Sequence, residues 1–109
     1  MTAWRVELLN ENVAVEVNGL PTDIRAKFLH IAEVMIAVEP QRMREPHVKP
    51  LRDKLWEMRM SGKEGIGRAI YVLASNRRIV VLHAFVKKAQ KTPSQAIELA
   101  LARAKEILP

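Results

Sequence analysis

The stretch that decides the fold is GRAIYVLASNRRIVVLHAFV, residues 67–86. It holds two apolar runs rich in β-branched and aromatic residues, and the polar turn SNR, residues 75–77, separates them. Such a pair predicts a β-hairpin. A third strand candidate, LWEMRM at 55–60, precedes the hairpin across the polar turn SGKEG at 61–65. The three runs together predict an antiparallel meander.

Upstream of the meander, the sequence predicts a strand, an ambiguous segment and a helix. WRVELL at 4–9 alternates apolar and charged residues and predicts a half-buried strand. NENVAVEVNG at 10–19 fits either a strand or a short helix. From Pro21 the apolar residues fall at helical spacing until Glu39-Pro40 ends the helix, and the predicted core positions are Ile24, Phe28, Ile31 and Met35. PQRMREPHVKP, residues 40–50, holds three prolines and predicts an irregular exposed connection.

The chain closes with TPSQAIELALARAKEIL, residues 92–108, which predicts a C-terminal helix. Thr92 with Gln95 has the pattern of a capping box, and Pro93 suits the first helical position. Ile97, Leu101 and Ala104 form the predicted buried stripe. The expected architecture is therefore α+β, with two helices, a sheet of about four strands and a terminal helix.

Length and composition limit the classes of function. At 109 residues the chain is long enough for a single domain, which we place at residues 1–109. It has no cysteine, which excludes disulfides and thiolate zinc sites and fits a reducing compartment. We find no 18-residue apolar run and no signal-peptide pattern, so we expect a cytoplasmic protein without a membrane partner. The three histidines lack metal-ligand spacing and there is no glycine-rich phosphate loop, so we expect no metal and no cofactor.

The positive charge is concentrated in one half of the sequence. The formal net charge is +6, but residues 42–91 contain thirteen Lys or Arg and four Asp or Glu, a balance of +9. The remainder holds five and eight, a balance of −3. Such asymmetry points to a polyanionic partner that binds one face. A solvated basic surface without function is the alternative.

The predicted meander brings several charged residues to one end of the sheet. If SGKEG and SNR are the turns, Arg68 lies opposite Met58 on one side and Ala84 or Phe85 on the other. Several charged or titratable side chains then fall within a rung or two, namely Glu57, Arg59, Arg68, His83 and Lys87. Such a cluster would bind a phosphate backbone. Alternatively, Glu57 forms an ordinary ion pair with Arg59 or Arg68.

Four segments in this order carry a family resemblance: LRDKLWEMRM, GRAIYVL, IVVLHAFVKKAQKTP and AIELALAR. They resemble the RelE/ParE superfamily of bacterial toxins, and specifically its HigB-like branch of phage-derived Gp49-like proteins. The resemblance implies a compact RelE-like fold with N-terminal helices packed on a twisted, mainly antiparallel sheet. It also implies a type II toxin that cleaves mRNA in the A site of the 70S ribosome. The implied partner is an antitoxin, typically a helix-turn-helix protein of the HigA kind.

Cleavage of RNA through its own 2′-hydroxyl requires a base, a proton donor and cations at the phosphate. The resemblance implies that Arg68 contacts the scissile phosphate, so Arg68→Ala should abolish most cleavage while the fold survives. Further candidates in catalysis are Lys87 and Lys88 as second cation or acid, Arg59 beside them, and His47 or Glu57 as the base. Lys49, Lys54, Lys63 and Lys91 are expected in loops or turns, where they would attract RNA by charge alone.

One departure from the family pattern leaves the activity open. RelE toxins carry a tyrosine in the C-terminal segment, whereas residues 89–109 contain none and the single tyrosine is Tyr71. Catalysis must therefore differ in detail or be weak. Two alternatives remain, a ParE-like inhibitor of DNA gyrase and a phage-derived protein that binds nucleic acid without cutting it. His83 and Trp56 fit core positions better than functional ones.

Overall fold

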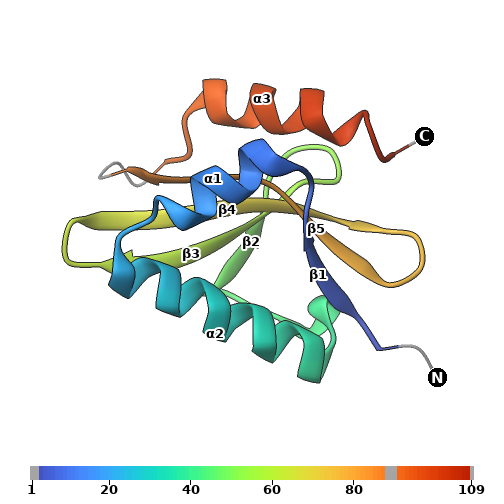
Figure 1. The fold of residues 1–109 in the computed structure, drawn as a ribbon. Helices are drawn as coiled ribbons and strands as arrows, with labels where there is room; N and C mark the ends of the chain where they lie inside the picture. The colour runs from blue at the N-terminus through green and yellow to red at the C-terminus, as the bar shows by residue number, and fades with distance from the viewer. Residues whose placement is uncertain (1–2, 88–90, 109) are drawn as a thin grey trace.

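The computed structural model describes residues 3–87 and 91–108. In chain order the elements are β1 (Arg5–Leu8), α1 (Glu11–Asn18), α2 (Thr22–Val38), the 3-10 helix η1 (Pro40–Arg42), β2 (Val48–Pro50), β3 (Trp56–Gly62), β4 (Gly65–Ala74), β5 (Arg78–Lys87) and α3 (Ser94–Ala104). Figure 1 shows a central sheet with α2 and α3 on opposite sides of it. The predicted α+β class is confirmed.

The sheet has the strand order β1-β5-β4-β3-β2. β3, β4 and β5 form the predicted antiparallel meander, while β1 pairs with β5 in parallel. β2 is a fifth strand that the sequence analysis missed. The side chain of Val48 in β2 is buried, and the backbone of β2 pairs with Trp56–Met58. Part of the proline-rich connection is therefore ordered by the sheet.

The ambiguous segment is helix α1, because local capping and burial both favour a helix there. The side chain of Asn10 accepts a hydrogen bond of 3.1 Å from the amide of Val13, which satisfies one of the open amides at the helix start. Val13 and Val17, one helical turn apart, are buried. They pack with the predicted core face of α2 into one hydrophobic core, whereas α3 covers a second core on the opposite face of the sheet.

Helix α2 lies directly on the meander because the sheet carries a glycine beneath it. A Cβ atom on Gly67 would lie 2.2 Å from Cγ2 of Ile24, a distance that no side chain tolerates. This close contact holds α2 against β4 at the residue that precedes Arg68. The predicted core residues of α2 are all buried and the helix ends before Glu39 and Pro40, as expected.

Helix α3 begins differently from the prediction. The expected capping box is wrong: Pro93 is the N-cap, no side chain caps the helix, and the hydroxyl of Thr92 faces the sheet instead. The buried stripe is Ala96, Ala100 and Ala104, one position away from the predicted stripe except at Ala104. Small residues let the helix axis approach the sheet closely, and the larger Ile97 and Leu101 pack at its sides.

A β-bulge in β5 is stabilised by Glu16 of α1 and Arg103 of α3. Ile70 pairs with His83 but Tyr71 pairs with Val81, so Leu82 is the additional residue. The bulge turns backbone groups away from β4, and side chains satisfy them. Arg103 Nη1 donates to the Leu82 carbonyl at 2.7 Å, and the Ala84 amide donates to Glu16 at 3.1 Å.

Glu16 also joins both helices to the sheet electrostatically. Arg103 donates to its two carboxylate oxygens at 3.1 and 3.0 Å, and His83 Nδ1 lies 2.9 Å away. Burial alone would raise the pKa of Glu16, but the hydrogen bonds from Arg103, His83 and Ala84 outweigh it and lower the pKa. The carboxylate form is therefore favoured by folding.

This coupling predicts how stability depends on pH. Above the ordinary glutamate pKa, about 4.5, Glu16→Gln should cost about 1.5–3 kcal/mol, the usual value for hydrogen bonds to a charged group. Because the pKa of Glu16 is lowered in the folded state, this contribution is lost as the pH falls from the ordinary pKa through the lowered one. Urea unfolding of both proteins between pH 7 and pH 3 should show the difference shrinking. A difference that stays constant would show that Glu16 acts by shape alone.

The hairpin between β4 and β5 carries local strain at Arg77. Asn76 and Arg77 have φ values of 64° and 55°, a conformation that is costly for a side chain other than glycine. Arg77→Gly should therefore raise the free energy of unfolding by roughly 0.5–1 kcal/mol. Arg77→Ala, which keeps the strain, should not. Equal thermal stability of the two variants would contradict this explanation.

Candidate nucleic-acid interface

The register of the meander aligns the cationic side chains on the α3 face of the sheet. Arg68 lies opposite Arg59 on one side and Phe85 on the other. The predicted partner Met58 was one residue off, whereas Phe85 is confirmed. Side chains of directly paired residues share a face, so Arg59 and Arg68 project together.

A polar cluster forms where the segment before α3 crosses these strands. Arg59 Nε donates to Glu57 Oε1 at 2.8 Å, and the Thr92 hydroxyl donates to the other oxygen of Glu57. Arg68 Nη1 donates to Thr92 Oγ1 at 3.0 Å. We call these four residues, Glu57, Arg59, Arg68 and Thr92, the Glu57 cluster.

The Glu57 cluster is buried except at Arg59. Glu57 and Arg68 are 0% exposed, whereas the side chain of Arg59 is 21% exposed. Burial lowers the pKa of Arg68, the charge of Glu57 raises it, and the charge of Arg59 lowers it further. The ion pair between Glu57 and Arg59 that the sequence left open is present. Arg68 therefore lies beneath the surface, where its positive charge is balanced by the carboxylate of Glu57.

More of the predicted cations surround this cluster. Lys49 is on β2 and not in a loop, directly opposite Glu57, so its side chain is on the same face. Lys87 is exposed at the end of β5, and Lys91 is exposed next to Thr92. Lys88, predicted as a second cation, lies outside the described residues. Lys49 and Lys87 thus lie on strands that pair with those of the Glu57 cluster, and Lys91 lies on the segment that carries Thr92.

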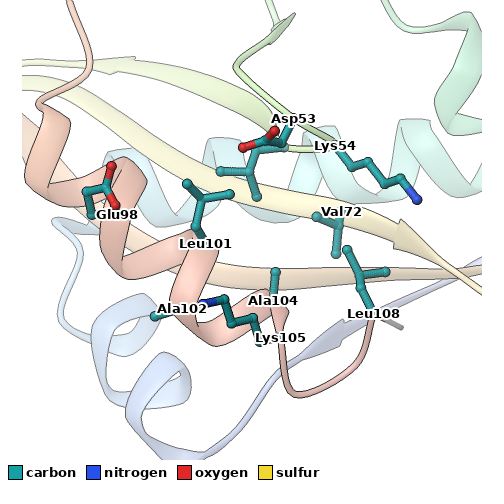
Figure 2. A pocket seen from close by; sticks show the side chains of 10 residues that line it. Asp53, Lys54, Val72, Glu98, Leu101, Ala102, Ala104, Lys105 and Leu108 are labelled. Atoms are coloured by element: carbon teal, nitrogen blue, oxygen red, sulfur yellow. The ribbon is translucent and has the colours of Figure 1, made fainter.

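Two of the predicted RNA-binding lysines lie elsewhere. Lys54 precedes β3 and Lys63 follows it, so the seven-residue strand separates them by about 20 Å or more. Figure 2 shows Lys54 at a groove beside α3, with Val72 and Leu108 lining it. The rim of this groove carries two acids, Asp53 and Glu98, as well as Lys54 and Lys105. Lys54 therefore does not belong to the group of cations around the Glu57 cluster.

The two predicted bases have different surroundings. His47 is exposed, and its backbone carbonyl accepts a hydrogen bond of 2.8 Å from the amide of Arg59. This bond places residue 47 beside the cluster. Glu57, in contrast, is buried and already accepts hydrogen bonds from Arg59 and Thr92. Of the two, His47 is the better placed to reach a substrate.

Tyr71 and His83 have structural roles. Tyr71 is 1% exposed on the α1/α2 side of the sheet, and burial raises the pKa of its phenol. It cannot replace the tyrosine that the C-terminal segment lacks. His83 contacts Glu16 and stacks on Phe85, with ring centroids 4.8 Å apart.

Thr92 is the one member of the cluster that the sequence analysis missed. A threonine before a proline and a helix has the same local pattern whether it caps the helix or faces a buried carboxylate. Only the pairing of the strands, which places Glu57 beneath residue 92, separates the two possibilities. Within the described chain, no group of three His, Cys, Asp or Glu side chains is placed to hold a metal ion.

Comparison with known proteins places this chain in a family. Residues 15–105 match the family described as "Phage derived protein Gp49-like (DUF891)". A search of curated protein sequences finds no match. Across the parts that the structure describes, no helix is both long enough and apolar enough to cross a membrane.

Two solved structures share the fold. A mutant of the E. coli toxin RelE in the free state has a TM-score of 0.68 at 15% identity, with 94% of this chain and 98% of that chain covered. The archaeal RelE-RelB complex from Pyrococcus horikoshii has a TM-score of 0.58 at 20% identity, with 83% and 100% covered. At these identities the likeness shows the RelE fold.

Proposed function

Because this chain belongs to the Gp49-like family of phage-derived proteins and has the RelE fold, we propose that it is the toxin of a type II toxin–antitoxin system. The proposed activity is ribosome-dependent, metal-independent cleavage of mRNA, which inhibits translation in the cytoplasm. The observation that carries the proposal is the cationic end of the sheet around the Glu57 cluster. RNA presents one negative charge per nucleotide, and this surface offers several cations at fixed spacing.

In this proposal the cations have two roles, and their exposure supports the division. Arg59 reaches solvent, and its Nε is fixed by Glu57, so it is the proposed contact to the scissile phosphate. Lys49, Lys87 and Lys91 would hold neighbouring phosphates. Arg68 acts as a positioning residue, because it is buried and binds the cluster through Thr92.

Proton transfer in this proposal uses His47. The base must take the proton of the 2′-hydroxyl, and histidine is the side chain that enzymes use most often for such a transfer. Backbone pairing with Arg59 places His47 at the same edge as the proposed phosphate contact. Lys87, at the strand end on the other side of Arg68, is the proposed donor to the leaving 5′-oxygen.

The burial of Arg68 favours one alternative. A guanidinium that is 0% exposed and lies beside a carboxylate can serve packing alone, as expected for a relative that binds nucleic acid without cutting it. A ParE-like gyrase inhibitor shares the fold but would need no cationic cluster.

The proposed regulator is an antitoxin of the helix-turn-helix, HigA-like kind. One structure that shares this fold is a complex of RelE with RelB. We propose that a bound antitoxin covers the cationic end of the sheet or prevents entry into the ribosomal A site. Mapping the protected residues by hydrogen exchange would distinguish these two modes.

Induced expression without an antitoxin tests the function. We expect growth arrest and new mRNA 5′ ends that appear only on translated messages. Equal cleavage of a message that lacks a ribosome-binding site would remove the ribosome from the mechanism. Intact mRNA with altered DNA supercoiling would support gyrase inhibition, and intact mRNA with normal supercoiling would support the non-catalytic alternative.

A further inference from the structure

A pocket of 560 Å³ lies at the edge of β3 and shares Arg59 with the Glu57 cluster. Four of its lining residues are basic or titratable: Lys27 and His30 from α2, His47 from the connection before β2, and Arg59 from β3. Only Arg59 and His47 were predicted as site residues. Lys27 and His30 belong to a helix for which the sequence indicated only core positions.

The pocket exists because β2 covers only part of β3. The strands pair over Trp56–Met58, and the next bond joins the Arg59 amide to the His47 carbonyl. Further along this edge, Lys27 Nζ donates to the carbonyl of Ser61. A side chain of α2 thus occupies the position that a neighbouring strand would take, and it brings a cation to the edge.

The lining combines cations with an apolar surface. No carboxylate is among the described residues that line it, and its apolar members Pro46 and Ile66 both reach solvent. Two acids of the neighbouring elements are engaged elsewhere: Asp23 accepts from the amides of Ile24 and Lys63, and Glu57 accepts from Arg59 and Thr92. Pockets that bind small ligands are typically apolar with a few placed polar groups, and a nucleotide has both parts.

We propose that this pocket binds one nucleotide of a single-stranded RNA. The phosphate would lie between Lys27 and Arg59, the base would contact Pro46 and Ile66, and the two imidazoles would donate hydrogen bonds at the rim. The inference rests on the proposed function, since Arg59 belongs to both the pocket and the Glu57 cluster and so connects them. The apolar part of the lining favours a nucleotide over an acidic protein segment, for which surface charge is enough.

The test is an NMR titration of the whole protein with a four-nucleotide RNA, followed by binding measurements on variants. The side-chain signals of Lys27 and His30 should shift and saturate together. Lys27→Ala should weaken binding roughly threefold to tenfold at low salt and lower the salt slope by about 0.7, the value for one phosphate contact on a single strand. Lys105→Ala, which removes an equal charge beside α3, should change neither quantity.

Several outcomes separate this inference from the proposed function. If Lys27→Ala and Lys105→Ala bind RNA equally and the His30 signal does not move, the pocket is not a nucleotide site, even if the wild type cleaves mRNA on ribosomes. If a glutamate-rich peptide shifts the same signals as strongly as RNA, the pocket binds acidic segments and the inference is wrong. Saturable RNA binding in the pocket without ribosomal cleavage would support the pocket and contradict the endonuclease.

Discussion

Replacing Glu57 with alanine is expected to lower the free energy of unfolding by about 3–5 kcal/mol, because it leaves a buried arginine without its carboxylate. Glu57 and Arg68 are both fully buried, and Thr92 joins the carboxylate to the guanidinium. For a domain of this size, each kcal/mol corresponds to roughly 4–8 °C in Tm. Thermal and urea unfolding of the two proteins should therefore differ widely.

The matched control is Glu64→Ala, which removes the same charge from an exposed turn. Its effect should stay within about 0.5 kcal/mol, as for most surface substitutions. Glu57→Leu combined with Arg68→Met should recover much of the loss, since removing both charges leaves neither unpaired. If the double variant is as unstable as Glu57→Ala, lost packing rather than an unpaired charge explains the effect. Similar stability of Glu57→Ala and Glu64→Ala would show that the cluster does not stabilise the fold.

Much of the fold could be predicted because the signals were local. The hairpin at residues 67–86 and the core face of α2 follow from apolar spacing and turn residues, and both are confirmed. β2 was missed because its three residues carry almost no periodicity and form a strand only by pairing with β3. The capping box at Thr92 failed for the same reason, since a contact distant in sequence overrides a local pattern.

The candidate site could be predicted only as a set of charges. Sequence placed Glu57, Arg59 and Arg68 together, because strand pairing is regular. It could not tell which guanidinium reaches solvent, since that depends on how the segment before α3 crosses the sheet. From the sequence, Arg68→Ala is predicted to keep the fold. Because Arg68 is fully buried, we now expect this variant to lose stability together with any activity.

Arg59 is consequently the residue whose replacement separates chemistry from folding. Arg59→Ala is expected to lower single-turnover cleavage on programmed ribosomes by about 10²-fold or more, the usual cost of one donor to transition-state charge. Its side chain is partly exposed, so the loss of stability should be smaller than for Glu57→Ala. Arg59→Lys should rescue poorly, because an ammonium cannot bind Glu57 and a phosphate through separate donors at fixed geometry.

Lys63→Ala is the control for charge alone. Lys63 is exposed in the β3–β4 turn, and its bond to Asp23 uses the backbone amide, which alanine retains. We expect this variant to weaken RNA binding by a fewfold. Added salt screens the same long-range attraction in the wild type, so the difference between the two proteins should shrink as salt is added. The Arg59 defect should instead persist at saturating ribosome concentration, because it lies in the chemical step. If Arg59→Ala and Lys63→Ala lose similar activity, and both losses disappear at saturation, Arg59 belongs only to the attracting surface and the proposed phosphate contact is wrong.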